Sequence, residues 1–397
     1  MISTIAALPF IWTSRASSVS IDGSTQVRFR LLSQLIVFLL PCRMYLIQFF
    51  DEWQDFRKGE LLALLEMFGV NVLPYKTEYE HSDLFLYVDL PSDSIAQQIC
   101  GRSIVIKAIY EVWGTGASLD EAAEVTRSAY SKGMIKEAGK YTGVDISWCL
   151  DVQLIYKKVT SNLKGAFRER FRFLNFQGPV KLKEPDVNIT VLLDYSKYKD
   201  KPYESESPDV STYCGRLVCM GGMRTALRKY DIKKRLYIGP TTLDHALAFI
   251  MANMAGAQRG NLCLDPFVGT ASLLVALAHH GAFCFGSDID VRVIRGMMYA
   301  GQHRVQDSNK AKAAAEKEGR QVSRDVFSTF SDYGLPPPQL LRLDLHSHNK
   351  HFHTTSHGMF DSIVTDPPYG IRAGGRKTGK STAVSYEVSE ARRHDHI

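Results

Sequence analysis

A strand-helix-strand pattern in the last third of the chain constrains its fold more than any other feature. Residues 262–264 and 283–285 are short apolar stretches typical of buried strands, and residues 271–280 between them have the apolar spacing of a helix. Asp265 directly follows the first strand, and Asp288 lies at the end of the second. Strands joined by a crossover helix run parallel, so their carboxyl ends meet at one edge of the sheet, where doubly wound folds bind ligands. The pattern predicts a doubly wound α/β domain with both aspartates at its ligand edge.

The loop after the first strand indicates which cofactor this domain binds. Gly269 is its single glycine, whereas a dinucleotide pyrophosphate needs several glycines for close approach of the backbone. A nicotinamide-dependent dehydrogenase is therefore disfavoured. S-adenosylmethionine carries no phosphate, and its cationic sulfonium and ammonium groups are favoured near carboxylates. Aspartates after strands are also common as N-caps of the following helices. An acid at the end of the second strand commonly binds the ribose hydroxyls of a cofactor, and Asp290 is a weaker candidate for this role than Asp288. We expect cofactor contacts at Asp265, Phe267, Gly269, Thr270 and the ribose-binding Asp288.

Two more segments are expected beside this pocket. Residues 340–345 read as a third strand that ends at Asp344, where an acid usually meets the adenine amine of the cofactor in this fold. Thr241 and Thr242 begin a helix with apolar residues at helical spacing, and their hydroxyls suit either an N-cap or a cofactor contact. The Ala-, Lys- and Glu-rich residues 306–319 predict a solvated helical insertion.

A fourth apolar strand, residues 360–364, runs into a turn that carries chemistry, Asp366-Pro367-Pro368-Tyr369-Gly370. Prolines fix φ and donate no backbone hydrogen bond, so they stiffen this turn. The Asp366 carboxylate and the Pro367 carbonyl form a pair of acceptors for a planar NH₂ group, and Tyr369 can stack on the base that carries it. An ordinary turn would explain the motif alone, but not its place after a fourth strand of the same domain. We expect a catalytic site for an exocyclic amine of a nucleobase, formed by Asp366, Pro367, Pro368 and Tyr369.

The region ahead of this domain contains no chemical motif. From Met44 to about Leu193, strand and helix patterns alternate, which predicts an α+β region. Ser118 and Glu121 predict a capping box at the start of one of its helices. Another helix is basic, with Lys164, Arg168, Arg170 and Arg172. These residues form either a solvated helix face or an RNA-contacting surface, and the sequence leaves both open. The polar residues 197–208 predict a linker.

Composition limits the cellular setting. The formal charge of +6 permits a polyanionic partner without requiring one. The seven cysteines are scattered without a Cys-x-x-Cys pair, which favours a reducing compartment and argues against a zinc site in this chain. Several histidines between His346 and His357 lack ordered spacing, so we expect no metal. No apolar run is long enough to span a membrane, and we expect a cytoplasmic protein.

Residues 1–43 differ from all that follows. They are rich in Ser and Arg, contain one acid and end in an apolar stretch, a balance typical of an organelle-transit or secretory segment. An artefact of a wrongly extended gene model is the alternative that we prefer, because a regular strand pattern begins at Met44. We therefore leave this N-terminal extension out of the predicted fold.

Four motifs together resemble one enzyme family. They are Tyr-Ile-Gly-Pro-Thr-Thr-Leu-Asp at 237–244, Asp-Pro-Phe-Val-Gly-Thr at 265–270, Gly-Ser-Asp-Ile-Asp at 286–290 and Thr-Asp-Pro-Pro-Tyr-Gly-Ile-Arg at 365–372. This set resembles the tRNA (guanine-10-N2)-methyltransferase family of eukaryotes and archaea. The likeness extends from about residue 44 to residue 380 and is strongest after Tyr213.

The resemblance implies a ferredoxin-like plus THUMP region that docks tRNA, which we place at residues 44–195, and a linker at 196–236. It also implies a Rossmann-like domain at 237–380, followed by a polar tail at 381–397. This domain would transfer a methyl group from S-adenosylmethionine to the N2 amine of guanosine 10 in tRNA. Eukaryotic members work with a small zinc-binding activator subunit, so a heterodimer is expected. By the same match, the amine is held by Asp366 to Tyr369, the ribose by Asp288, and the cofactor is lined by Asp265 and Gly269.

Two departures from the family pattern stand out. Ala271 occupies a position where the family often has glycine, which should narrow that turn. The fold normally continues for three more strands, whereas this chain ends in a polar tail soon after Gly370. The fourth strand is then expected to be an uncovered apolar edge, which natural sheets avoid. We therefore expect a C-terminally truncated chain, and its own activity stays undecided by the sequence.

Two rival functions stay open. An adenine-N6 methyltransferase acting on DNA or RNA would use the same pair of acceptors, although no segment for duplex DNA recognition is visible. A non-catalytic RNA-binding or assembly protein is the second rival, since truncation would remove activity and leave the binding region.

Overall fold

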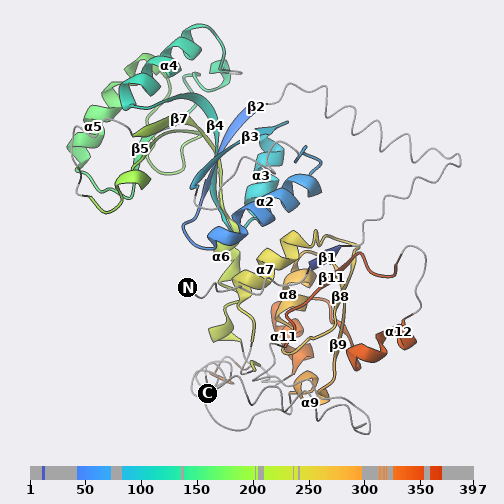
Figure 1. The fold of residues 1–397 in the computed structure, drawn as a ribbon. Helices are drawn as coiled ribbons and strands as arrows, with labels where there is room; N and C mark the ends of the chain where they lie inside the picture. The colour runs from blue at the N-terminus through green and yellow to red at the C-terminus, as the bar shows by residue number, and fades with distance from the viewer. Residues whose placement is uncertain are drawn as a thin grey trace, which may run out of the picture. The chain divides into compact units, whose positions relative to one another are not determined.

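The computed structural model describes residues 11–13, 43–72, 83–135, 138–201, 203, 210–235, 237–239, 242–296, 313, 316–317, 319, 325–352 and 358–368. The chain divides into two units. The first unit is formed by residues 22–225, and the second by residues 1–21 together with 226–397. Each unit contains its own mixed sheet (Figure 1), and the predicted α/β fold class is confirmed.

The first unit is built on a six-stranded sheet with the order β3-β2-β4-β7-β6-β5. Its strands are β2 (Arg43–Phe49), β3 (Phe85–Leu90), β4 (Ile106–Gly116), β5 (Trp148–Ile155), β6 (Val187–Asp194) and β7 (Ser211–Met220). Neighbouring strands run antiparallel except β5 and β6, which are parallel. Its helices are α2 (Gln54–Met67), α3 (Asp93–Arg102), α4 (Leu119–Ser131) and α5 (Ser161–Glu169). A parallel pair needs a crossover connection, and the chain that includes α5 supplies it between β5 and β6.

Local capping begins helix α4 much as the sequence predicts. The Ser118 hydroxyl accepts the N–H of Glu121 at 3.2 Å. The Glu121 carboxylate reaches back to the N–H of Ala117 at 2.8 Å, one residue before the position that the capping box pattern specifies. Two backbone donors near the start of the helix are satisfied in this way.

Strand β7 corrects the predicted linker at 196–236. It lies within that range and is a central strand, paired antiparallel with β4 on one side and β6 on the other. Arg216 interrupts its apolar pattern, which hides the strand from a reading of the sequence. The fold accommodates this cation because its guanidinium lies 2.9 Å from a carboxylate oxygen of Glu111 and 2.6 Å from one of Asp93.

The second unit carries a five-stranded sheet with the order β1-β11-β8-β9-β10. Strands β8 (Leu262–Asp265), β9 (Phe283–Asp288), β10 (Gln339–Arg342) and β11 (Ser362–Val364) are parallel, and β1 (Ile11–Thr13) pairs antiparallel with β11. The parallel strands follow the order third, second, first, fourth, which is one half of a doubly wound sheet. The described helices from residue 223 onward are α6 (Met223–Leu227), which spans the division between the units, α7 (His245–Met254), α8 (Ser272–His279), α9 (Val291–Ile294), α11 (Val326–Tyr333) and α12 (His348–His351) (Figure 1).

Strand β1 corrects two predictions from the sequence. It belongs to residues 1–43, which the predicted fold leaves out, and it covers the edge of β11, which is predicted to be bare. Ile11 is paired with Val364 and Thr13 with Ser362. An edge strand offers unpaired N–H and C=O groups that another segment can satisfy. Three residues so far from β11 in the chain give no local signal of that pairing.

The core of the second unit forms where α7 and α8 pack together beside β8 and β9. The largest fully buried members include Phe249, Ile250, Met251, Leu274 and Leu277. Both helices are buried along continuous runs, residues 248–253 and 273–278, as helices in a protein interior are. This packing holds the carboxyl ends of β8 and β9 in a fixed relation.

Candidate functional site

The four acids predicted at strand ends lie along one edge of the five-stranded sheet. They are Asp265 at the end of β8, Asp288 at the end of β9, Asp344 two residues after β10 and Asp366 two residues after β11. The register places Leu264 opposite Ile363 in the parallel pair of β8 and β11, so these strands end together. Asp265 and Asp288 accept backbone N–H groups from the same loop after β8, those of Phe267 and Gly269. Thr365, which directly precedes Asp366, donates to Asp265, so the three acids lie near one another.

Asp265 is the most buried of these acids, with 1% of its surface exposed. Its Oδ1 accepts the N–H of Phe267 at 3.0 Å and the hydroxyl of Thr365 at 2.9 Å. Burial raises the pKa of this carboxyl to about 7. The two hydrogen bonds act to lower the pKa, and the charges of Asp288 and Asp366 raise it. A cation bound nearby would favour the ionised form of Asp265.

Asp288 holds the loop from β8 to α8 against the end of β9. Its Oδ2 accepts the N–H of Gly269 at 3.0 Å, and its Oδ1 accepts the N–H of Asp290 at 2.9 Å. Gly269 has a φ of +50°, in the left-handed region that glycine enters without strain. Asp290 is engaged by α9, because it caps the N–H of Arg292 and pairs with the guanidinium of that residue. The structure therefore places Asp288, and not Asp290, against the β8–α8 loop.

The segment ahead of α7 lies against the same loop. The hydroxyl oxygens of Thr242 and Thr270 are 3.1 Å apart and share a hydrogen bond. The N–H of Gly239 donates to the Thr242 hydroxyl at 2.8 Å. A Cβ at Gly239 would come within 2.9 Å of the Thr270 methyl group, so this close approach favours glycine.

The N-cap of α7 corrects a prediction. Asp244 begins the helix, because its carboxylate accepts the N–H of Ala246 at 2.9 Å and that of Leu247 at 3.2 Å. Thr242 is instead engaged with Thr270, and Thr241 lies outside the described residues. A carboxylate two residues further on outcompetes the hydroxyls because it satisfies two orphan donors at once.

Arg235 is a residue of this neighbourhood that the sequence did not single out. Its side chain is buried, and its guanidinium donates to the Ser272 hydroxyl at 2.9 Å and to the carbonyl of Thr270. Burial lowers its pKa to about 10. In the sequence this arginine only ends a basic run, Lys233-Lys234-Arg235, and its burial reveals the contact with the β8–α8 loop.

Ala271 ends that loop with strained backbone. Its φ is +65°, in the left-handed region that costs a residue with a Cβ roughly 1–2 kcal/mol. It stands at the position where glycine is common in the family that the motifs resemble. The methyl group is fully buried, which recovers part of the cost.

The turn after β11 is described as far as its second proline. Thr365 is buried, Asp366 and Pro367 are half-buried, and Pro368 is exposed. Tyr369 lies outside the described residues. The described part places the Asp366 carboxyl at the same edge as Asp265, as the motif predicts.

Asp344 is engaged with its own turn. Its Oδ1 accepts the N–H of His346 at 3.0 Å and lies 3.0 Å from the Nδ1 of the same ring. The described residues contain no group of three or more His, Cys, Asp or Glu side chains that could hold a metal ion. His353 and His357, which belong to the histidine-rich stretch, lie outside the description.

Comparison with known proteins identifies the family of this chain. A family model described as the Tmrp11 THUMP N-terminal domain matches residues 43–223. The tRNA (guanine(10)-N(2))-methyltransferase TRMT11 of Homo sapiens is 31% identical over 347 residues, which cover 87% of this chain and 70% of that protein. This chain belongs to the tRNA (guanine(10)-N(2))-methyltransferase family.

Further similarities accompany this family assignment. The tRNA (guanine(10)-N(2))-methyltransferase of Saccharomyces cerevisiae is 30% identical over 332 residues, 83% of this chain and 68% of that protein. Among solved structures, TrmN from Thermus thermophilus matches with a TM-score of 0.36 and 16% identity, covering 82% of this chain and 80% of that one. That structural similarity is too low to bear on function.

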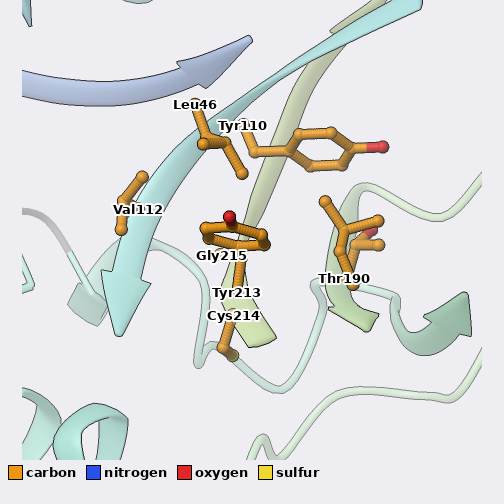
Figure 2. A pocket seen from close by; sticks show the side chains of 8 residues that line it. Leu46, Tyr110, Val112, Thr190, Tyr213, Cys214 and Gly215 are labelled. Carbon is orange, nitrogen blue, oxygen red and sulfur yellow. The ribbon is translucent and has the colours of Figure 1, made fainter. Parts of the chain in front are cut away.

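A hollow in the first unit is lined by none of the predicted site residues. It lies on the six-stranded sheet, and Figure 2 shows the rings of Tyr110 and Tyr213 beside Leu46, Val112 and Thr190. Its lining is mostly apolar, without charged groups to fix a cofactor. Among the described helices, none is long and apolar enough to cross a bilayer.

Proposed function

We propose that this chain transfers a methyl group from S-adenosylmethionine to the exocyclic N2 amine of guanosine 10 in tRNA. Membership of the tRNA (guanine(10)-N(2))-methyltransferase family supports the reaction. The observation that supports the site is the convergence of three carboxyl groups, those of Asp265, Asp288 and Asp366, at one edge of the sheet.

The residues at this edge fit S-adenosylmethionine. The charges that act on buried Asp265 are those of two other carboxyl groups, so a cationic ligand would stabilise the ionised form of Asp265. Asp288 keeps lone pairs beyond the two that its N–H donors occupy, and these would accept the ribose hydroxyls. The lining would be supplied by Asp265, Phe267, Gly269, Thr270, Thr241, Thr242 and Asp344. When bound, the cofactor supplies an electrophilic methyl group on sulfur.

The chain's own part in the chemistry is to hold and orient the guanine amine. Asp366 and the carbonyl of Pro367 would accept the two amine hydrogens and turn the nitrogen lone pair toward the methyl group. Tyr369 would stack on the base after it leaves its own stack, at a cost of about a few kcal/mol. The new N–C bond forms as the S–C bond breaks. The nitrogen becomes acidic as this happens, so the Asp366 carboxylate suffices to receive its proton. Much of the rate then comes from positioning and electrostatics.

The rest of the chain has a place in this proposal. Residues 44–195 would dock the tRNA, which the THUMP family model over residues 43–223 supports. Residues 237–380 would carry the transfer. We also propose a heterodimer with a small zinc-binding activator subunit, which the resemblance of the motifs implies, and a cytoplasmic location.

Asp366→Ala tests the function directly. We expect transfer of labelled methyl groups to tRNA to fall by about 100-fold or more, because the amine loses one of its two acceptors. Binding of S-adenosylhomocysteine, measured by calorimetry, should stay near that of the wild type. Asp332→Ala, at an exposed position of α11, is the matched control and should leave both measurements unchanged.

The same assay separates the rival functions. Methylation of duplex DNA in place of tRNA would favour an adenine-N6 methyltransferase. A wild-type protein that binds tRNA, does not bind S-adenosylhomocysteine and transfers no labelled methyl group would favour a non-catalytic function. A wild-type rate for Asp366→Ala would remove Asp366 from the mechanism.

A further inference from the structure

The hydroxyl of Thr365 makes an internal contact that crosses from one functional turn to the other. It donates to Oδ1 of Asp265 at 2.9 Å, and both side chains are buried, with 8% and 1% of their surfaces exposed. Thr365 follows β11, whereas Asp265 ends β8, about 100 residues earlier. A hydrogen bond to a carboxylate in such a place is stronger than a neutral one, because water does not compete for either group.

The backbone pairing of the two strands stops short of this contact. The register of β8 and β11 pairs Cys263 with Ser362 and Leu264 with Ile363. Beyond these paired residues, the Thr365 side chain joins the two turns through its hydrogen bond to Asp265. Asp366 is the next residue, and two prolines with fixed φ follow it. A constraint on Thr365 is therefore passed directly to Asp366 and to the Pro367 carbonyl.

The same carboxylate oxygen also serves the cofactor side. Oδ1 of Asp265 accepts the N–H of Phe267, which belongs to the β8–α8 loop. One buried oxygen thus joins the loop that would line the methyl donor to the turn that would hold the amine.

We propose that Thr365 is a positioning residue for methyl transfer, whose hydroxyl, by donating to Asp265, sets the distance and angle between the amine-holding turn and the methyl donor. This role rests on the proposed function. Reacting atoms need alignment to a few tenths of an ångström, and a misplacement of about 1 Å costs on the order of 100-fold in rate. Thr365 itself need not touch substrate or cofactor.

A pH profile offers a readout that a merely structural threonine would not move. The hydrogen bond from Thr365 lowers the pKa of Asp265, which burial raises to about 7. The groups that face Asp265 are the carboxyls of Asp288 and Asp366 and the thiol of Cys284, which burial keeps neutral. The ionised form of Asp265 accepts both hydrogen bonds more strongly than the neutral form, and it alone balances a cation. Removing the Thr365 donor raises the pKa of Asp265 further, so the acid limb of the rate profile moves to higher pH.

The experiment compares Thr365→Val with Thr365→Ser in the full chain. Valine matches threonine in shape but cannot donate, whereas serine keeps the hydroxyl. For Thr365→Val we expect kcat on tRNA to fall roughly 10- to 100-fold, with S-adenosylhomocysteine affinity changed by less than about threefold. Its acid limb should lie at higher pH than that of the wild type. Thr365→Ser should restore both kcat and the pH profile. Thr329→Val is the matched control, since it removes a buried threonine hydroxyl that donates to the Asp325 carbonyl of α11.

Each outcome has a defined meaning. A Thr365→Val enzyme with wild-type kcat and an unshifted acid limb overturns the positioning role, as does a Thr365→Ser enzyme no better than the valine variant. Should Thr365→Val fail to fold, Thr365→Cys against Thr365→Ser makes the same comparison of a weak donor with a strong one. Absence of transfer by the wild type overturns the proposed function together with this role. If the wild type transfers methyl groups and Thr365→Val does so at the same rate, only the positioning role of Thr365 is overturned.

Discussion

At the scale of single residues, Asp265 shows how burial gives a common side chain unusual properties. An aspartate in water has a pKa of about 3.9, but that of Asp265 is about 7 because the group lies in the interior near two other carboxyls. Its neighbours satisfy one oxygen with two donors. Such a group is poised to respond to a cation, and it makes the folded protein itself sensitive to pH.

Asp265→Asn tests this sensitivity in the absence of cofactor. Because the folded-state pKa is raised, the wild-type group contributes stability that is complete below about pH 4 and is lost as the pH rises through 7. Asparagine keeps an acceptor for Phe267 and Thr365 but does not titrate. We expect the free energy of unfolding of the variant, relative to that of the wild type, to rise by on the order of 2–4 kcal/mol between pH 4.5 and pH 8.

Denaturant unfolding at a series of pH values provides the measurement. The control Asp332→Asn, at an exposed position, should show no comparable trend. A difference between Asp265→Asn and wild type that stays constant across this range would mean that Asp265 ionises normally.

At the scale of elements, strand β9 depends on the absence of a side chain at Gly286. A Cβ there would contact a methyl group of Val268, and would lie 2.9 Å from Leu274 Cδ1 and 3.1 Å from Leu340 Cδ2. These neighbours belong to the β8–α8 loop, to α8 and to β10. The glycine therefore allows three elements to meet at the strand that carries Asp288.

Gly286→Ala should destabilise the second unit by about 1–3 kcal/mol, the range found for overpacked cores. We also expect weaker binding of S-adenosylhomocysteine, because the β8–α8 loop must move away. Gly165→Ala is the opposite case, since nothing lies within 4 Å of its added Cβ and α5 should gain roughly 1 kcal/mol. Hydrogen exchange of β9 and α5 measures each effect locally. Equal protection of β9 in wild type and Gly286→Ala would contradict the packing account.

At the scale of the whole molecule, the unit proposed to dock tRNA and the unit proposed to carry methyl transfer share one chain with a net charge of +6. Only part of the basic helix α5 and its flank is available for RNA. Arg168 donates to the Leu150 carbonyl at 2.9 Å, and Arg170 lies 2.9 Å from Asp120. Lys164 is therefore the better probe of a nucleic-acid contact, while Arg168 supports the fold of its own unit.

Lys164→Ala should weaken tRNA binding and reduce the slope of log affinity against log salt by about 1, if this helix contacts a phosphate. Lys132→Ala, at the exposed end of α4, is the control within the same unit. Filter binding at several salt concentrations gives both slopes. An unchanged slope for Lys164→Ala would mean that α5 presents a solvated face.

The sequence alone determined the parts of this protein that depend on local pattern. The strand ends that carry Asp265 and Asp288 follow from apolar spacing, as does the turn at Asp366. Their shared edge follows from the rule that crossover strands are parallel. The family assignment from the motifs is confirmed, because those motifs are contiguous runs of a few residues each.

The tertiary structure alone decided what depends on distant neighbours. Strand β7 is not recognisable from the sequence, because Arg216 interrupts its apolar pattern. It is a central strand because β4 and β6 pair with its two edges. Arg235 contacts Ser272, and Thr365 donates a hydrogen bond to Asp265. Both contacts join segments that are far apart in the chain, so no local sequence pattern predicts them. Burial and strand pairing depend on which segments pack together in the folded chain. Packing excludes water, and the loss of water changes the pKa of a side chain and the strength of its hydrogen bonds.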